Sequence, residues 1–357
     1  MDIKKYLKIM IEKNASDMFY RAGSNVRMRI DGKVVPVDEK IIGLDEVNES
    51  VKRLTSNELR DFFQRNLDVD FGVYIPELDH RFRISIFMQR NWPALVVRNI
   101  RSDIQTFQEL SLPVDVLEKL SMETKGLVLL TGSAGSGKST TIASMIEYIN
   151  THSNKHILTV EEPIEFTFKD RNSIINQREL GLDVSSYAVA LRAFNLQSPD
   201  VIYIGNIRDH ETMSAALTAA ETGVLVLSTL HTINAAQTVE RIINFFPPHQ
   251  HPQIRNQLSS LLKGVISLRL VSFKDKAGRI PAYEVMLHTP TISRLIREDK
   301  TWEILQFIED GEVFGMRSFN QSLVKLVQEG KINEEDAAIF SDNKDEFTLA
   351  LRGIKRM

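Results

Sequence analysis

The sequence predicts an α/β protein with two domains, and three observations lead to this class. The chain contains 357 residues, which is more than one compact domain usually needs. A continuous apolar run at residues 127–130 leads into a glycine-rich loop and then into a helix pattern at 138–149. Further apolar runs, at 157–160 and 201–204, have the length and composition of buried strands. We therefore predict buried parallel strands in the second part of the chain.

The composition limits the classes of partner and of chemistry. A net charge of −3 gives no support for binding nucleic acid or an anionic membrane surface through the charge of the whole chain. The sequence has no cysteine, which excludes disulfides, cysteine-based zinc sites and thiol catalysis. Its first residues carry no signal-peptide pattern, and no apolar run approaches the roughly 20 residues that a membrane span requires. We expect a cytoplasmic protein that binds no nucleic acid.

Residues 1–101 are predicted to form a small N-terminal α/β domain. The pair Asp31-Gly32 is a strong signal for a hairpin turn between two strands. Apolar and polar residues alternate across 81–88, and the residues expected to face the core are Phe82, Ile84, Ile86 and Met88. The expected elements are helices at 3–13, 47–54 and 57–63, and strands at 18–20, 26–30, 33–37, 81–88 and 95–100.

Two arginines of this domain are candidate intersubunit residues. Arg83 points away from the predicted core face, and Arg98 lies on the last strand of the domain. Charged side chains of this kind are most often solvated surface residues. The alternative is that one or both reach the nucleotide of a neighbouring subunit, as arginine fingers do.

A connector at 102–124, interrupted by Pro113, is expected to lead into a second domain at 125–357. A short helix is predicted near the end of the connector. The expected elements of the second domain are strands at 127–130, 157–160, 201–204, 224–229, 266–273 and 280–286, and helices at 138–149, 211–222, 235–246 and 254–265. A helical tail from about 290 is expected to contain helices at 292–297, 319–328 and 334–340.

The glycine-rich loop matches the pattern G-x-x-x-x-G-K-[ST] between a strand and a helix. Its glycines let successive backbone N–H groups face a phosphate chain, and the helix N-terminus adds positive potential. Lys138 is expected to reach the β- and γ-phosphates of ATP, and the hydroxyl of Ser139 is expected to bind Mg²⁺. The residues expected to contact the nucleotide are Gly132, Ser133, Ala134, Gly135, Ser136, Gly137, Lys138, Ser139 and Thr140.

Two polar segments follow the next buried strands. Glu161, Glu162 and Glu165 come after the strand at 157–160. Ligands of open α/β sheets bind at the carboxyl edge of the strands, so a catalytic carboxylate is expected here, although a solvated acidic turn explains the spacing equally well. Asn206 follows the strand at 201–204, where a P-loop ATPase normally has an acidic residue. A carboxamide can orient a water but can neither take its proton nor neutralise Mg²⁺, which weakens the case for fast hydrolysis.

The histidines give one candidate site residue. His231 lies just past the strand at 224–229, at the expected edge of the P-loop and of Glu165, so we interpret it as a phosphate sensor rather than a structural residue. His249 and His251 flank one residue after a proline break. Their spacing could suit a metal, but no further ligands cluster nearby in the sequence, which favours exposed loop histidines.

These motifs together resemble the type IV pilus retraction ATPase family, the PilT/PilU group of secretion-type motor ATPases. The resemblance runs nearly from end to end, and the tail at 314–323 is similar to the PilU side of the group. The matching segments are 131–141, 157–165, 176–179, 198–202, 208–209, 219–223 and 229–232. The resemblance implies a PAS-like N-terminal domain, a RecA-like C-terminal ATPase domain, and a homohexameric ring docked on the cytoplasmic face of the inner-membrane pilus platform.

The resemblance also implies roles for single residues. Lys138 and Ser139 correspond to the family's phosphate and Mg²⁺ ligands, Glu165 to its catalytic glutamate, which would be the general base for water, and His231 to its second His-box histidine. Four positions depart from the family pattern and put the hydrolysis rate in doubt: Asn206 at the Walker B glutamate, Val224 at the first His-box histidine, Ser198 at an aspartate and Leu196 at an arginine.

Two functions of different classes remain open at this point. The first is a hexameric motor that hydrolyses ATP to drive type IV pilus retraction and twitching motility. The second is a nucleotide-binding ring subunit with little or no ATPase activity of its own, which assists an active paralogue. Motors for pilus extension or secretion are disfavoured, because those relatives usually carry a longer N-terminal region and a four-cysteine metal motif.

Overall fold

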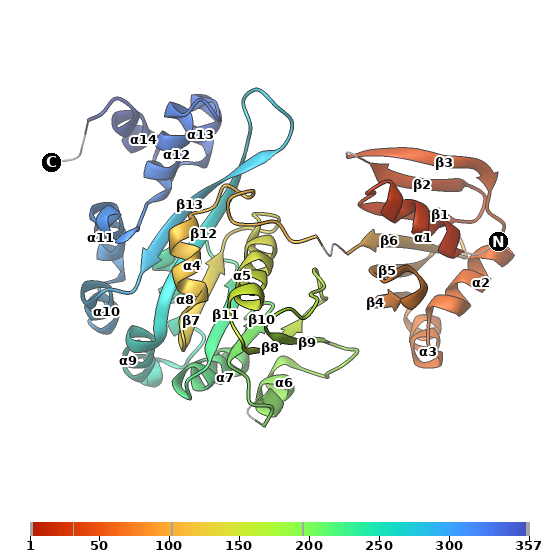
Figure 1. Cartoon of the computed structure of the whole chain (residues 1–357), viewed down its shortest axis with the longest axis horizontal. Helices are drawn as coiled ribbons and strands as arrows, with labels where there is room; N and C mark the ends of the chain where they lie inside the picture. Colours follow the sequence, from red (N-terminus) through yellow and green to blue (C-terminus); the bar gives the residue numbers. More distant parts are fainter. Residues whose placement is uncertain (1–2, 31, 101–102, 195, 355–357) are drawn as a thin grey trace. The chain divides into compact units, whose positions relative to one another are not determined.

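The computed structural model describes residues 3–30, 32–100, 103–194 and 196–354. The chain divides into two compact units, one of residues 1–103 with 163–167 and the other of residues 104–162 with 168–357. Each unit contains its own β-sheet, which confirms the α/β class (Figure 1). The predicted turn residue Asp31 and the predicted domain boundary at residue 101 lie outside the described residues.

The first unit is an antiparallel sheet covered by helices. Its strands are β1 (Asp17–Arg21), β2 (Asn25–Ile30), β3 (Lys33–Ile41), β4 (Asp68–Ile75), β5 (His80–Gln89) and β6 (Trp92–Asn99), in the order β3-β2-β1-β6-β5-β4. The helices are α1 (Ile3–Glu12), α2 (Leu44–Leu54) and α3 (Asn57–Asn66). Apolar residues of α1, α2 and the strands share one core, as burial of one sheet face requires.

Two sequence expectations differ from the structure of this unit. Strand β4 was not predicted, because Gly72 interrupts its alternating pattern and the strand exposes polar residues at its start. Phe82, Ile84 and Ile86 are fully buried as expected, but Met88 is only half-buried. Met88 lies near the end of β5, where pairing with β6 is about to end at a turn, so the core no longer covers it.

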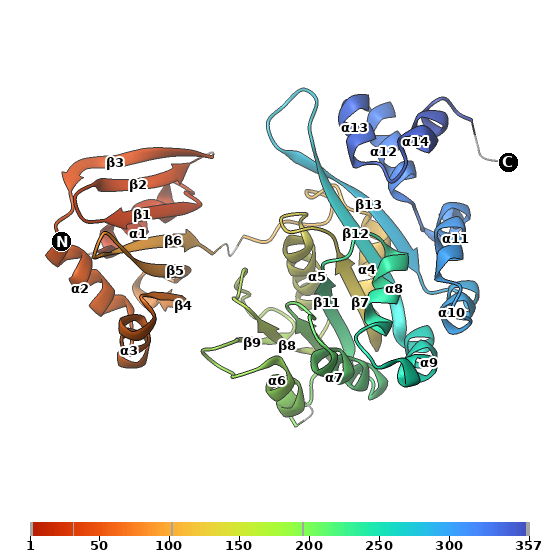
Figure 2. The ribbon, with the colours of Figure 1, turned by 180° about the vertical axis from the view of Figure 1, so that it is seen from behind.

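The second unit is built on a mostly parallel sheet with the order β13-β12-β7-β11-β10-β8-β9. Its parallel strands are β7 (Gly126–Thr131), β8 (His156–Glu161), β9 (Ile174–Glu179), β10 (Val201–Ile204), β11 (Leu225–Leu230) and β12 (Leu262–Ser272), and β13 (Arg279–Leu287) is antiparallel. Helices α4 (Val114–Ser121) and α5 (Lys138–His152) lie over one face (Figure 1), and α7 (His210–Glu221) and α8 (Ala235–Ile243) lie over the other (Figure 2). Burial on both faces explains why these strands read as continuous apolar runs.

The boundary between α9 (His251–Leu261) and β12 is wrong in the sequence prediction, which extended the helix to residue 265. From Leu262 onward the chain pairs with β7 on one side and β13 on the other. The apolar run there fits a helix or a strand, and pairing on both edges decides for the strand. Strand β9 and α6 (Tyr187–Phe194) were also not predicted.

The C-terminal helices are α10 (Pro290–Arg297), α11 (Ile304–Asp310), α12 (Phe319–Gln328), α13 (Glu334–Phe340) and α14 (Lys344–Leu351). Helix α10 packs on α9 and α11 packs on α8, whereas α12 contacts β13 and α13 contacts β12. A small separate core joins α12–α14 to Val271, Ile280 and Ala282 of the hairpin. Within the part of the chain that the structure describes, no helix is both long and apolar enough to cross a membrane.

The carboxyl of Glu284, on β13, is buried inside this unit. It accepts hydrogen bonds from the Ala235 backbone N–H, at 2.7 Å, and from the Ser267 hydroxyl, at 3.4 Å. Burial raises the pKa of Glu284 to about 7; the backbone N–H lowers it, Asp342 raises it further and Arg269 lowers it. Folding therefore favours the neutral carboxyl, so the stability that this group contributes is fully present below pH 4.5 and is lost as the pH rises through 7.

Glu284→Gln should remove this pH dependence, because the amide has the same shape but does not ionise. Between pH 5 and pH 8 the unfolding free energy of the wild type should fall relative to the variant by up to about 3 kcal/mol. Denaturant unfolding of the full chain at several pH values measures the difference. The exposed carboxylate Glu312, changed to Gln, is the control. A constant gap between wild type and Glu284→Gln at every pH would contradict the assignment.

Candidate functional site

Parallel pairing brings the predicted site segments to one edge of the second sheet. Strand β11 pairs with β7 on one side and with β10 on the other, and β10 pairs with β8. Because all four strands run in the same direction, the segments that follow them lie at the same edge. This edge carries the P-loop after β7, Asn206 after β10 and His231 after β11.

The P-loop turns sharply at Gly132, where only glycine fits. Its φ is +140°, and a Cβ there would lie 2.5 Å from the carbonyl oxygen of Leu268 and 2.5 Å from Oγ of Ser136. The loop is therefore pressed against β12 at its start. Gly135 also has a positive φ, of +74°, but no atom lies within 4 Å of its would-be Cβ. The tip of the loop is open, and Ser133, Ala134 and Gly135 are exposed.

Lys138 begins α5 and folds back over this loop. Its ammonium donates to the carbonyl oxygens of Gly132, at 2.9 Å, and Ser133, at 2.8 Å. The side chain is 7% exposed, so its charge lies inside the loop rather than in bulk solvent. Ser139 and Thr140, the next two residues, are partly exposed in the first turn of α5. A helix N-terminus beside a buried ammonium makes this a strongly anion-attracting position.

These residues fit a nucleoside triphosphate with its Mg²⁺. The open cradle at Gly135 leaves room for phosphate oxygens, and Oγ of Ser136 is buried without a hydrogen-bond partner in the described part of the chain. No cluster of three His, Asp or Glu side chains is arranged for a metal among the described residues. Mg²⁺ in phosphate-binding sites keeps several waters and takes other ligands from the phosphates, with a hydroxyl such as that of Ser139 beside them.

Asn206 lies two residues past β10 and is half-buried. Its Oδ1 atom is buried and has no hydrogen-bond partner among the residues that the structure describes. The surrounding backbone is fixed, because Thr229 Oγ1 donates to the Gly205 carbonyl at 2.7 Å and Ile207 N donates to the Thr229 carbonyl at 3.2 Å. The carboxamide oxygen is thus a held acceptor that can orient a water.

His231 follows β11 directly and is exposed. Its pKa is lowered by partial burial and also by the positive charges of Lys138 and Arg208. Parallel pairing of β7 and β11 places His231 and the P-loop at the same edge of the sheet, and Lys138 is near enough for its charge to act on this pKa. The imidazole is therefore neutral at physiological pH and can donate one hydrogen bond to a phosphate oxygen.

The three carboxylates at the end of β8 and in the segment after it have different surroundings. Glu161 is buried and accepts from Thr159 Oγ1 at 2.7 Å. Glu162 pairs with Arg208 at 3.0 Å, which links the segments after β8 and β10. Glu165 is exposed, belongs to the segment 163–167 of the first unit, and makes no hydrogen bond or ion pair with any described residue. Of the three, Glu165 has the carboxylate that is left available for chemistry.

Comparison with known proteins decides the family. The model of the type II/IV secretion system protein family matches residues 1–338. The type IV pilus ATPase PilU of Pseudomonas aeruginosa is 39% identical over 352 residues, which cover 99% of this chain and 92% of that protein. The retraction ATPase PilT of the same organism is 39% identical over 337 residues, which cover 94% of this chain and 97% of PilT. The chain belongs to the PilT/PilU group of this family.

A solved structure supports the assignment to this group. The crystal structure of the pilus retraction motor PilT with bound ADP has a TM-score of 0.89 and 41% identity, covering 97% of this chain and 98% of that one. The ATPase DotB of Legionella pneumophila, at 22% identity and a TM-score of 0.81, shares the fold, covering 99% of this chain and 96% of that one. These matches confirm the predicted resemblance and the two-domain α/β class, whereas the PAS-like character of the first unit stays a prediction.

The four departures from the family pattern lie at opposite edges of the sheet. Val224 precedes β11, so the length of that strand, about 20 Å, separates it from His231. Ser198 lies before β10, in a turn with φ +50°, and Leu196 is 89% exposed after α6. Asn206 alone of these four lies at the edge of the P-loop. Of the four positions that differ from the family pattern, only Asn206 therefore lies beside the nucleotide site of its own chain.

The two candidate arginines lie side by side on the first sheet, where β5 and β6 pair Arg83 with Arg98. Arg83 forms an ion pair with Asp70, and Arg98 pairs with Asp17 at 3.3 Å. Neither arginine belongs to the core of its unit. These carboxylates partly neutralise the two guanidinium charges. Such ion pairs are typical of surface residues, and they would also hold a guanidinium in position for a neighbouring subunit.

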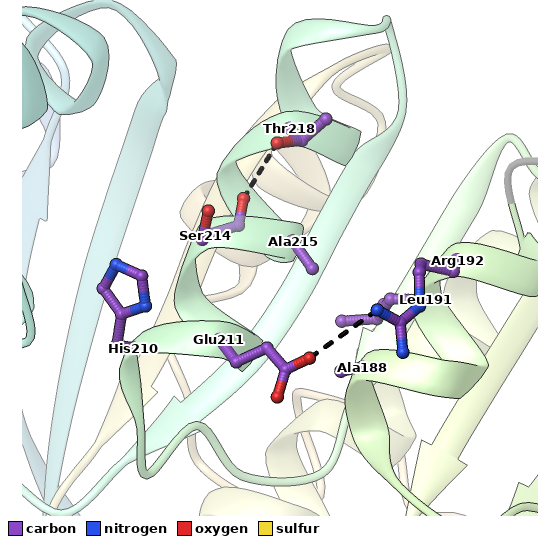
Figure 3. Close-up of a pocket in the computed structure, with 8 residues that line it drawn as sticks. All are labelled: Ala188, Leu191, Arg192, His210, Glu211, Ser214, Ala215 and Thr218. Atoms are coloured by element: carbon purple, nitrogen blue, oxygen red, sulfur yellow. Dashed lines mark hydrogen bonds and ion pairs between the residues drawn. The ribbon is translucent and has the colours of Figure 1, made fainter.

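Other polar groups of the second unit form no part of this edge. His251 bonds the Phe246 carbonyl oxygen at 2.9 Å, and His249 is exposed. A cavity of about 280 Å³ lies between α6 and α7, where Arg192 reaches Glu211 at 3.8 Å (Figure 3). Residues of α6 and α7 line this pocket, and none of the predicted nucleotide-binding residues is among them.

Sequence reasoning missed two features of the edge. The Glu162–Arg208 ion pair joins segments that are far apart in the chain, and only the order of the strands reveals it. The Tyr187 hydroxyl, on the unpredicted helix α6, is buried without a partner among the described residues and lies 3.5 Å from the would-be Cβ of Gly205. Burial raises the pKa of Tyr187, so this hydroxyl stays protonated.

Gly132→Ala should destabilise the nucleotide-free protein by about 2–4 kcal/mol, because its Cβ would collide with the backbone of β12. Gly135→Ala is the matched control, since it has a positive φ but open space and should cost about 1 kcal/mol. Denaturant unfolding of both variants without nucleotide measures the difference. Equal losses would mean that the loop is not pressed against β12.

Proposed function

We propose that the protein is an ATP-hydrolysing motor of type IV pilus retraction. The carrying observation is the P-loop edge, where a buried lysine, a helix N-terminus and a neutral histidine converge after neighbouring parallel strands. Membership of the PilT/PilU group supports the same function, since relatives named a retraction ATPase and a twitching motility protein are about 40% identical to this chain. The energy of ATP hydrolysis would drive the removal of pilin subunits.

In this function the residues of this edge, together with Glu165, divide the work of hydrolysis. The backbone N–H groups of the P-loop and the Lys138 ammonium bind the phosphates and stabilise the charge on the transferred phosphoryl group. The Glu165 carboxylate accepts the proton of the attacking water, and Asn206 helps to orient that water through its oxygen. His231 donates a hydrogen bond to the terminal phosphate and so distinguishes ATP from ADP.

Ser139 is the residue that would hold Mg²⁺. When bound, the ion supplies positive charge that neutralises the phosphate oxygens. The Ser139 hydroxyl, in the first turn of α5, contributes one neutral oxygen ligand. The Asn206 oxygen is suited to hold a water of its shell by hydrogen bonding.

The motor would be a homohexameric ring in which a neighbour completes each site. Arg83 and Arg98 are the candidates for this role, because both guanidiniums lie on the exposed side of the first sheet. Such a ring would act in the cytoplasm, peripherally on the inner-membrane platform of the pilus. Hydrolysis would then move the N-terminal unit of one subunit against the ATPase unit.

A second function follows from Asn206. A neutral carboxamide at this position leaves the edge without the acidic residue that P-loop ATPases normally carry there. Loss of one such group can lower the rate by orders of magnitude and leave binding intact. The alternative is therefore a nucleotide-binding ring subunit with weak turnover, which assists an active retraction ATPase paralogue.

Steady-state ATPase assays of the purified ring test the choice between the two. The motor function predicts turnover that Glu165→Gln lowers by about a hundredfold or more, because the general base is lost. Asn206→Glu should raise the rate about tenfold or more if the missing carboxylate limits it. Nucleotide binding by each variant, measured in the same preparation, is the control for folding.

Wild-type turnover no higher than that of Glu165→Gln would exclude the motor and favour the assisting subunit. An unchanged or lower rate in Asn206→Glu would show that this position does not limit hydrolysis.

A further inference from the structure

Arg269, on β12, connects three segments of the second unit that are distant in the sequence. Its guanidinium donates to the Phe340 carbonyl oxygen at 2.5 Å and to the Asp342 carboxylate at 2.5 Å. It also donates to the Ile233 carbonyl oxygen at 3.4 Å. Phe340 ends α13 and Ile233 lies two residues past His231. One side chain thus bonds both the C-terminal helices and the loop that carries His231.

The guanidinium is held in place from a further side. It lies over the ring of Phe319, on α12, with 3.6 Å between its central carbon and the ring centre. The Arg269 side chain is 17% exposed and that of Asp342 is 28% exposed. A planar guanidinium that is stacked, largely buried and bonded to several acceptors has little freedom to rearrange. Its contacts are therefore stronger than those of an ordinary surface ion pair.

The same face of the hairpin fixes the other end of the His231 loop. Ser267 and Arg269 are two apart on β12 and so point to the same side, and Ser267 pairs across the hairpin with Glu284. Glu284 accepts the backbone N–H of Ala235, the first residue of α8, at 2.7 Å. Ser267 also accepts a hydrogen bond from Thr131, directly before the P-loop, at 2.9 Å. The loop 231–234 is held between Arg269 and Glu284.

We propose that Arg269 is a positioning residue that couples the C-terminal helices to His231. The tail, through Phe340 and Asp342, fixes the guanidinium, and the guanidinium fixes the carbonyl of Ile233. Release of the tail frees the loop and lets the His231 imidazole move. The effect of this coupling on ATP turnover rests on the proposed function, in which His231 contacts the terminal phosphate. Among the described residues, Arg269 forms no hydrogen bond or ion pair with the P-loop.

Hydrogen exchange of the full-length, nucleotide-free chain tests the coupling without any activity. Asp342→Asn removes the charge that anchors Arg269 from the tail, and Arg269→Met removes the whole contact. Both changes should speed the exchange of amides in residues 229–238 by about fivefold or more, because the loop opens more often. Arg269→Lys keeps the positive charge but replaces the planar guanidinium with a single ammonium group, so it should restore part of the protection.

Asp299→Asn is the matched control. Asp299 pairs with Arg255 at 2.7 Å in the same unit, and Arg255 is 14% exposed, so this change breaks a comparable ion pair that does not touch the His231 loop. Exchange at 229–238 should stay as in the wild type. Equal protection in Asp342→Asn and wild type, or an equal loss in Asp299→Asn, would overturn the proposal. Should Arg269→Met fail to fold, Asp342→Asn and Arg269→Lys still decide.

ATP turnover of the same variants gives a second readout. A positioning role predicts that Asp342→Asn lowers kcat about threefold or more with little change in KM, since the P-loop is intact. A parallel change in kcat and KM would contradict it. If the wild type shows no turnover, the proposed function fails, but the exchange result still tests the coupling.

Discussion

The parallel pairing of β7, β11, β10 and β8 is the constraint on which the whole site depends. The strands share one direction and pair without offset, so each ends at the same edge of the sheet. A register shift of one residue would move the end of a strand by about 3.3 Å along its axis and out of line with its neighbours. The buried apolar runs that fix the register therefore also fix where the P-loop, Asn206 and His231 meet.

The charges at this edge favour the binding of an anion. Lys138 is held inside the loop, Arg208 lies nearby with its charge shared by Glu162, and His231 is kept neutral. The position that would add a negative charge carries Asn206, whose oxygen is buried. A site of this kind suits a triphosphate, and in the proposed function its rate depends on Glu165 as the general base.

Local patterns predicted much of the fold, and long-range pairing decided the rest. The P-loop and the buried strands could be predicted from short stretches of sequence, because a local motif or a continuous apolar run is enough to identify each of them. The start of β12 did not, since residues 262–265 fit helix and strand equally and only pairing with β7 decides. The Glu162–Arg208 pair and the contacts of Arg269 could not be predicted, because they require the strand order and the position of the tail.

The central proposal is that this edge holds ATP and, with Asn206 in place of an acidic residue, turns it over slowly. A single-turnover experiment tests it directly: protein in excess is mixed with Mg²⁺ and ATP, and bound nucleotide and released phosphate are followed in one sample. We predict rapid and complete retention of ATP, followed by phosphate release with a rate constant below about 1 s⁻¹, at the low end of enzyme turnover. Failure to retain ATP, or phosphate release as fast as ATP binding, would contradict the claim.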